Sequence, residues 1–203
     1  MYILIIIADK MQNQTKFLKK WRKFMAYRVV IDAGHGGFDN GASYNGRKEK
    51  TDTLRLALLV GQILAENGVD VVYTRTTDIY QSPTRKAQIG NELGGDLFVS
   101  IHRNAAYAPN VYDGVQTLIY NMGDIKEQFA NNINQELEEV GYKKIGTEVR
   151  KNLAVLSQTK MPALLVEAGF IDSDIDNQLF DEKFYQTANA IATGIIETVM
   201  QNQ

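Results

Sequence analysis

The chain has 203 residues, of which 44% are hydrophobic and 23% charged, as expected for one globular domain with a full core. It contains no cysteine, so disulfides are excluded and any metal ion must be held by His, Asp or Glu. Residues 1–28 hold seven Lys or Arg and one acid, whereas residues 29–203 hold fifteen and twenty-three, and this acidic main part argues against nucleic acid as a partner.

The N-terminal segment, residues 1–27, is predicted to be a basic extension outside the main domain at residues 28–203. Its apolar run at residues 2–8 is too short to span a bilayer, and no signal peptide is evident. The basic, aromatic stretch at residues 16–24 is compatible with a surface helix, a membrane-touching helix or a leader before Met25. We favour an extension whose role the sequence does not reveal.

From residue 28 onward, apolar strands alternate with amphipathic helices. The predicted strands cover residues 28–32, 69–74, 96–101, 114–120, 147–156 (irregular around 151–152) and 162–167. The predicted helices cover residues 51–67, 83–93, 126–140 and 182–200, with polar loops at 34–50 and 104–113.

This alternation predicts a three-layer α/β fold, with a mostly parallel central sheet and helices on both faces. In such sheets a ligand site lies outside the carboxyl ends of the strands. Three side chains of interest fall at those ends: His35, His102 and Glu167. We therefore expect them to share a site.

Each candidate is ambiguous when taken alone. His35, between glycines, suits a turn, and Glu49 suits a solvated helix start near the positive end of the dipole. Glu167 directly follows an apolar run, so its carboxylate needs a cationic or protic partner. Together, two imidazoles and one carboxylate with an open position match a catalytic zinc site, and Glu167 is the candidate for proton transfer. A phosphate site is disfavoured, since no Gly-Lys-Ser/Thr follows the glycines.

A series of spaced motifs carries a family resemblance that covers about residues 28–200. The motifs are Val-Ile-Asp-Ala-Gly-His-Gly-Gly at 30–37, Asp-Asn-Gly-Ala at 39–42, Glu-Lys at 49–50, Thr-Arg at 74–75, Arg85 with Ile-Gly-Asn at 89–91, Asp-Leu-Phe-Val-Ser-Ile-His at 96–102 with Asn104, and Leu-Val-Glu-Ala-Gly-Phe-Ile at 165–171. In this order they resemble the zinc-dependent N-acetylmuramoyl-L-alanine amidases of the amidase-3 type.

The resemblance implies one Zn²⁺ ion held by His35, Glu49 and His102, with Glu167 as the catalytic acid/base. It implies a roughly six-stranded sheet and peptidoglycan as substrate, cut at the amide between the lactyl group of N-acetylmuramic acid and L-alanine. It also implies action at the cell wall, on the extracellular or periplasmic side, with no membrane span. We expect a monomer, with no nucleic acid bound.

Some positions depart from the family pattern. Arg103 stands where a small residue is usual, Asn40 where proline is common, and Pro83 where leucine is frequent. We hypothesise that Arg103 contacts a stem-peptide carboxylate, with a solvent-facing charge as the alternative.

Further residues are expected around the ligands. Asp32, Arg75 and Asn104 are candidates for orienting ligands or loops. A structural salt bridge is the alternative for Arg75.

Two other functions compete with the amidase. One is a zinc peptidase that cuts elsewhere in the stem peptide, and the other is a non-catalytic wall-binding module that keeps the fold. Within the amidase hypothesis, a phage lysin, a sporulation or germination amidase and an autolysin all fit the residues. Export is expected because the substrate lies outside the membrane.

Overall fold

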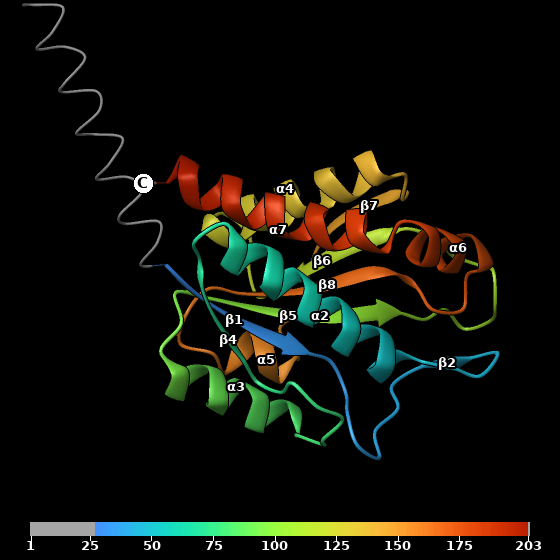
Figure 1. The fold of residues 1–203 in the computed structure, drawn as a ribbon, viewed down its shortest axis with the longest axis horizontal. Coiled ribbons are helices and arrows are strands. Elements are labelled where there is room, and N and C mark those ends of the chain that lie inside the picture. The colour runs from blue at the N-terminus through green and yellow to red at the C-terminus, as the bar shows by residue number, and fades with distance from the viewer. Residues whose placement is uncertain (1–26, 203) are drawn as a thin grey trace, which may run out of the picture.

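The fold is built on a six-stranded central sheet. The computed structural model describes residues 27–202 (Figure 1). In sheet order the strands are β4 (Asp70–Tyr73), β1 (Arg28–Ala33), β5 (Leu97–Asn104), β8 (Ala163–Phe170), β6 (Val115–Ile119) and β7 (Lys144–Val149). The first four run parallel, while β6 is antiparallel to β8 and parallel to β7. The carboxyl ends of β4, β1, β5 and β8 therefore meet at one edge.

Helices cover both faces of this sheet, which confirms the predicted three-layer α/β fold (Figure 1). One face carries α2 (Glu49–Glu66), α4 (Ile125–Val140) and α7 (Phe184–Gln201), and the other carries α3 (Pro83–Leu93) and α5 (Ala154–Ser157). The remaining elements are α6 (Asp174–Glu182), which follows β8, and a small antiparallel pair, β2 (Ser43–Tyr44) and β3 (Arg47–Lys48).

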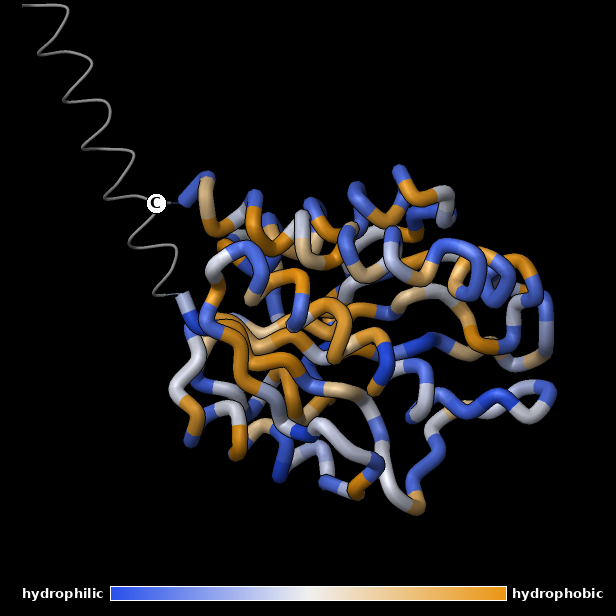
Figure 2. The backbone as a smooth tube through the Cα atoms, in the orientation of Figure 1, coloured by the Kyte–Doolittle hydropathy of each residue, from blue (hydrophilic) through white to orange (hydrophobic). Residues whose placement is uncertain are grey.

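The two faces of the sheet bury different residues because side chains alternate along a strand. In β1, Val29 and Ile31 belong to the core under α2, α4 and α7, whereas Val30 packs with Phe98 on the α3 and α5 face. All four are fully buried. Hydrophobic residues accordingly concentrate along the central strands (Figure 2).

Local sequence signals explain where α3 begins and ends. The Ser82 hydroxyl accepts a hydrogen bond from the Arg85 backbone N–H, and Pro83 occupies the first turn, where its missing N–H costs nothing. Gly94 ends the helix in the left-handed region at φ 66°. The predicted bounds of this helix are confirmed.

Four predicted elements differ from the structure by three residues or more, and one of them is the strand predicted at 162–167, which continues as β8 to Phe170. The predicted strand at 147–156 is wrong in its second half: β7 ends at Val149, and residues 154–157 form α5. The apolar Val155 and Leu156 explain both the prediction and the error, because they pack against Phe98 as a helix face rather than as a strand.

The predicted helix at 182–200 is two helices, α6 and α7, and β5 extends through His102 to Asn104 instead of ending at residue 101. No helix within residues 27–202 has the length and apolarity needed to cross a membrane. The predicted N-terminal extension lies almost entirely outside the described residues.

Candidate metal centre

The centre begins at the glycine-rich turn after β1. His35 adopts φ 58°, in the left-handed region, which costs a non-glycine residue of the order of 1–3 kcal/mol. A two-way backbone pairing of Gly36 with Asp39 closes the turn, with N–O distances of 3.0 and 3.1 Å. Gly34 has no room for a side chain: a Cβ there would lie 2.5 Å from the His102 ring. The glycine therefore lets the two histidines approach each other.

The Arg75 side chain contacts this turn, and its role in orienting a loop stays a prediction. Its buried guanidinium donates hydrogen bonds to the carbonyl oxygens of Ala33 at 3.0 Å, Gly34 at 2.7 Å and Thr77 at 3.0 Å. The Thr53 hydroxyl also donates to Gly34 O, at 2.8 Å. Among residues 27–202 Arg75 forms no ion pair, so the salt-bridge alternative is wrong.

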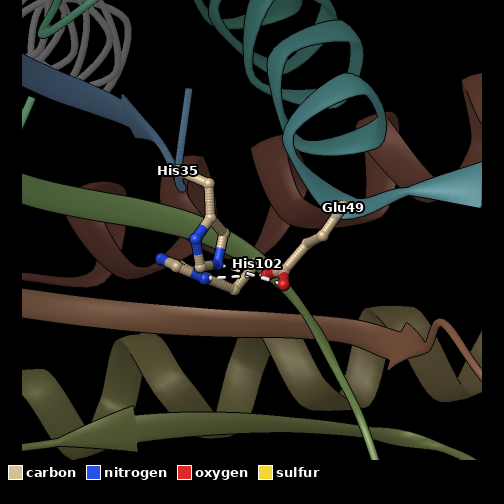
Figure 3. A group of neighbouring side chains, drawn as sticks. All are labelled: His35, Glu49 and His102. Atoms are coloured by element: carbon tan, nitrogen blue, oxygen red, sulfur yellow. Dashed lines mark hydrogen bonds and ion pairs between the residues drawn. The ribbon is translucent and has the colours of Figure 1, made fainter. Parts of the chain in front are cut away.

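Three side chains converge at the carboxyl edge of the sheet: His35 after β1, Glu49 at the start of α2 and His102 on β5 (Figure 3). His35 Nε2 lies 3.0 Å from Glu49 Oε2, and His102 Nδ1 lies 2.9 Å from Glu49 Oε1. One potential ligand atom from each residue lies within 4.8 Å of the others. The three predicted ligands are thus brought together.

The backbone fixes Glu49 in place. Its Oε2 accepts from the Ala42 N–H at 2.9 Å and its Oε1 from the Arg103 N–H at 3.1 Å. Burial opposes the charged form of Glu49, but hydrogen bonds from His102 and His35 outweigh it and lower the pKa of its carboxyl group. Glu49 is only 3% exposed, so the solvated helix-start alternative is wrong.

Asp39 orients His35. Its Oδ2 lies 2.9 Å from His35 Nδ1, while its Oδ1 accepts the Gly41 N–H at 3.0 Å. Burial disfavours the protonated imidazole, but the hydrogen bonds with Glu49 and Asp39 outweigh this and raise the pKa of His35. A carboxylate on the far nitrogen leaves Nε2 to face the centre, as is usual for metal-bound histidine.

Glu167 lies in β8 directly across from His102 in β5 and from Gln116 in β6. Its Oε2 is buried and has no hydrogen-bond partner. Burial raises the pKa of the Glu167 carboxyl group to about 7, with Glu49 adding to the rise and His102 opposing it. The Glu167 carboxyl group thus holds a proton more strongly than an exposed glutamate does, and its role in proton transfer stays a prediction.

Asp32 is fully buried behind the centre. Its Oδ1 accepts from Lys86 Nζ at 2.7 Å, and its Oδ2 accepts from the Ser100 hydroxyl at 2.6 Å. Lys86 Nζ also donates to the Ala33 carbonyl oxygen. These contacts join the end of β1 to β5 and α3, and the role of Asp32 in orienting ligands or loops stays a prediction.

Arg103 points away from the centre. Its side chain is fully buried, with NH1 2.9 Å from Asp52 Oδ2, NH2 2.8 Å from Asn177 Oδ1 and its guanidinium carbon 4.2 Å from the Phe180 ring centroid. All of its contacts are internal to the protein, so both the predicted stem-peptide contact and the solvent-facing alternative are wrong. The residue instead anchors β5 to α2 and α6.

Two neighbouring pockets adjoin the centre, and His35, His102, Leu153 and Leu165 line both; we call them the larger arm and the smaller arm of the site. The larger arm, of about 340 Å³, is also lined by Glu49, Asn104, Arg150, Asn152 and Glu167, and by Arg103, whose side chain is nevertheless fully buried. The smaller arm, of about 110 Å³, adds Asp32, Asp39, Gln81, Lys86 and Val155. Asn104, predicted near the ligands, thus lies in the larger arm.

Sequence reasoning missed Gln81 and Lys86 in the smaller arm. The family resemblance singles out Arg85, but Arg85 is exposed and pairs with Glu92 at 2.9 Å, whereas Lys86 is buried. The signal was present in the spacing, because Lys86, Ala87 and Gly90 form the inward face of α3. Gln81, in a polar loop, gave no such signal.

The residues fit a metal ion. Two imidazole nitrogens and a carboxylate converge at one point on an open cavity, which is the donor set of a catalytic zinc site that keeps a position free. The unpaired Glu167 oxygen lies in the same arm. Fold and site together define a metalloenzyme-like α/β domain with its centre at the carboxyl edge of the sheet.

Comparison with known proteins places the chain in a family. Residues 29–197 match the Amidase_3 family, described as N-acetylmuramoyl-L-alanine amidase. The chain belongs to this family, and its main domain is an N-acetylmuramoyl-L-alanine amidase domain. It is similar to a crystal structure of such an amidase from Clostridium difficile 630, with a TM-score of 0.79 and 32% identity, covering 85% of this chain and 96% of that one.

Two sequence relatives agree. The sporulation-specific N-acetylmuramoyl-L-alanine amidase of Bacillus subtilis (strain 168) is 37% identical over 174 residues, covering 83% of this chain and 66% of that protein. The N-acetylmuramoyl-L-alanine amidase CwlM of Bacillus licheniformis is 36% identical over 176 residues, covering 83% and 67%. The chain thus spans about two thirds of the length of these relatives.

Proposed function

We propose that this protein is a zinc-dependent hydrolase that cleaves the amide between the lactyl group of N-acetylmuramic acid and L-alanine in peptidoglycan. One observation carries the proposal: His35, Glu49 and His102 converge beside the unpaired Glu167 carboxyl group, in one cavity of an amidase-family domain. The names of the relatives support the choice of bond, and the chemistry of the four side chains supports the mechanism.

His35 Nε2, His102 Nδ1 and a Glu49 oxygen would hold the ion. A bound zinc ion lowers the pKa of a coordinated water toward about 7 and polarises a carbonyl group. The protein holds this donor set ready through Asp39, which orients His35, and through the backbone N–H groups that fix Glu49.

Glu167 would carry the proton. It takes a proton from the attacking water and delivers it to the nitrogen of L-alanine, so that the C–N bond breaks and a free amine leaves. The other product, from the carbonyl side of the cleaved bond, is the muramoyl carboxylate. Burial raises the pKa of the Glu167 carboxyl group above that of an exposed glutamate, and this higher proton affinity suits a group that takes up a proton and then releases it.

Digestion of defined muropeptides tests the proposal. Mass spectrometry is expected to find free stem peptides with an N-terminal L-alanine and intact glycan, and a chelator is expected to abolish the reaction. A shortened stem peptide or a released D-amino acid would instead identify a peptidase. Binding to walls without any cleavage, unaffected by chelator, would identify a wall-binding module, and either result would overturn the amidase proposal.

A further inference from the structure

The two arms of the site give the substrate a direction. Glu167 lines the larger arm and not the smaller one. A general acid must reach the nitrogen that leaves, within hydrogen-bond distance or through one water. If Glu167 protonates the L-alanine nitrogen, as in the proposed function, the stem peptide enters the larger arm. The muramoyl group, on the other side of the scissile carbonyl, then faces the smaller arm.

The smaller arm carries an unpaired acceptor. Gln81 Nε2 donates to the Thr74 carbonyl oxygen at 2.7 Å, which fixes the orientation of the amide, because a flipped side chain would set two oxygens against each other. Gln81 Oε1 is buried and has no hydrogen-bond partner. Among residues 27–202, Gln81 Oε1 and Glu167 Oε2 are the two buried side-chain atoms without a hydrogen-bond partner, and the two residues line different arms.

A donor and an apolar surface complete the smaller arm. Lys86 Nζ has three N–H groups and two acceptors, Asp32 Oδ1 and Ala33 O, so one N–H remains for a ligand. Leu165 of β8 and Val155 of α5 supply an apolar wall. One small volume therefore offers an acceptor, a donor and a hydrocarbon surface.

We infer that the smaller arm binds the 2-acetamido group of the muramoyl residue. In this assignment, which rests on the proposed function, the acetamido N–H donates to Gln81 Oε1, its carbonyl oxygen accepts from Lys86 Nζ, and its methyl group contacts Val155 and Leu165. The group fits by position, since it is borne on the sugar carbon next to the one that carries the lactyl ether. It also fits by size, because the arm has a third of the volume of its neighbour.

Synthetic muropeptides that differ only at the muramoyl 2-position test this assignment by kinetics. Replacing acetamido by a free amine is expected to lower kcat/KM roughly 30-fold or more, because it removes the carbonyl and methyl groups and adds a charge beside Lys86. Gln81→Leu is expected to lower kcat/KM for the acetamido substrate about 3- to 10-fold, with little change for the amine. Arg85→Gln, on the exposed side of α3, is the matched control and should leave the ratio unchanged.

A variant with an enlarged pocket is expected to gain activity toward a larger substrate, and a misfolded variant would show no such gain. Val155→Ala is expected to raise kcat/KM for an N-propanoyl substrate relative to the N-acetyl one by about tenfold, the usual effect of one methylene in an apolar pocket. A wild type that cleaves the acetamido and amine substrates equally, together with an unchanged ratio in Val155→Ala, would overturn the inference and leave the amidase proposal standing.

A binding measurement separates the two proposals further. N-acetylmuramic acid carries the product's sugar, so it can bind without turnover. Saturation-transfer NMR is expected to show the strongest transfer at its acetamido methyl, and Val155→Phe is expected to abolish it. Equal transfer to the acetamido and lactyl methyl groups would contradict the inference about the smaller arm, whether or not the enzyme cleaves muropeptides. A failure to cleave muropeptides would contradict the proposed function and leave this binding result unaffected.

Discussion

His102 and Glu167 lie directly opposite each other on the neighbouring parallel strands β5 and β8. A proposed ligand and the proposed proton carrier are thus held by the hydrogen-bonded ladder of one sheet rather than by two independent loops. The strand spacing sets the separation of their backbones, so the distance between these two residues can vary little.

Glu167→Gln is expected to lower kcat by roughly 100- to 10,000-fold, because the amide keeps the shape of the side chain but transfers no proton. Zinc content and substrate affinity should remain, since Glu167 is not a proposed ligand. Turnover of a defined muropeptide, paired with metal analysis, measures both. Glu66→Gln, at the exposed end of α2, serves as the control, and a variant at position 167 that retained wild-type turnover would contradict the mechanism.

The pH dependence of kcat/KM is expected to have an acidic limb governed by Glu167. Burial raises the pKa of this carboxyl group to about 7 in the absence of metal, so the folded protein retains a proton here at pH values where an exposed glutamate has lost it. A bound dication lowers that pKa, and activity should therefore fall as pH drops below 7. The residual activity of Glu167→Gln should lack this limb, with metal retention checked at each pH.

Asp39→Asn is expected to weaken zinc binding roughly 10- to 100-fold, the usual effect of removing a carboxylate that orients a ligand histidine. The amide can still contact the ring, but it no longer favours the tautomer that presents Nε2. Competition with a chromogenic chelator measures the affinity. Asp113→Asn, paired only with Lys143 at the surface, is the control and should bind zinc as the wild type does.

Arg103→Met is expected to destabilise the fold by about 3–5 kcal/mol, because it leaves a buried carboxylate with one partner fewer. Asp52 keeps Arg47, with Nε at 2.5 Å, so the loss should fall toward the lower end of that range. Thermal or urea unfolding measures it, with Arg85→Met as the exposed control. An unchanged stability and a raised KM would instead restore the idea that Arg103 contacts the stem peptide.

The wrong prediction for Arg103 shows where sequence reasoning stopped. Because β5 was expected to end before His102, nothing constrained the direction of the next side chain. The strand in fact continues to Asn104 with a register shift between His102 and Asn104, and the Arg103 side chain there turns toward Asp52 and Phe180. The residues His-Arg-Asn at 102–104 show no apolar pattern that would predict a strand. They are extended in the structure because they pair with β8.

The positions of His35 and His102 could be predicted because each lies at the end of an apolar strand, and local composition defines those strands. Glu49 begins a helix instead, and the family resemblance made it a proposed ligand. The spacing within α3 marks Lys86 as inward-facing, but the place of Gln81 and Lys86 at the site depends on α5, which lines the same smaller arm. That short helix has four residues and is specified by packing on Phe98 and Leu165 more than by its own propensity. Contacts of this kind are visible only once the sheet is assembled.

Gly34→Ala is expected to impair the metal centre specifically. A Cβ at this position would lie 2.5–2.7 Å from ring atoms of His102. The ring could move away only by losing its contact with the Glu49 carboxylate. We expect loss of zinc affinity together with an overpacking cost of about 1–3 kcal/mol.

Gly46→Ala separates this effect from backbone strain. Gly46 has φ 80°, but no atom lies within 4 Å of the position that an alanine Cβ would take, so alanine there should cost roughly 1–2 kcal/mol of stability and leave zinc affinity intact. Zinc titration of both variants at matched folded fractions makes the comparison. Equal zinc affinity in the two would mean that the close approach of Gly34 to His102 has no bearing on the ligand geometry.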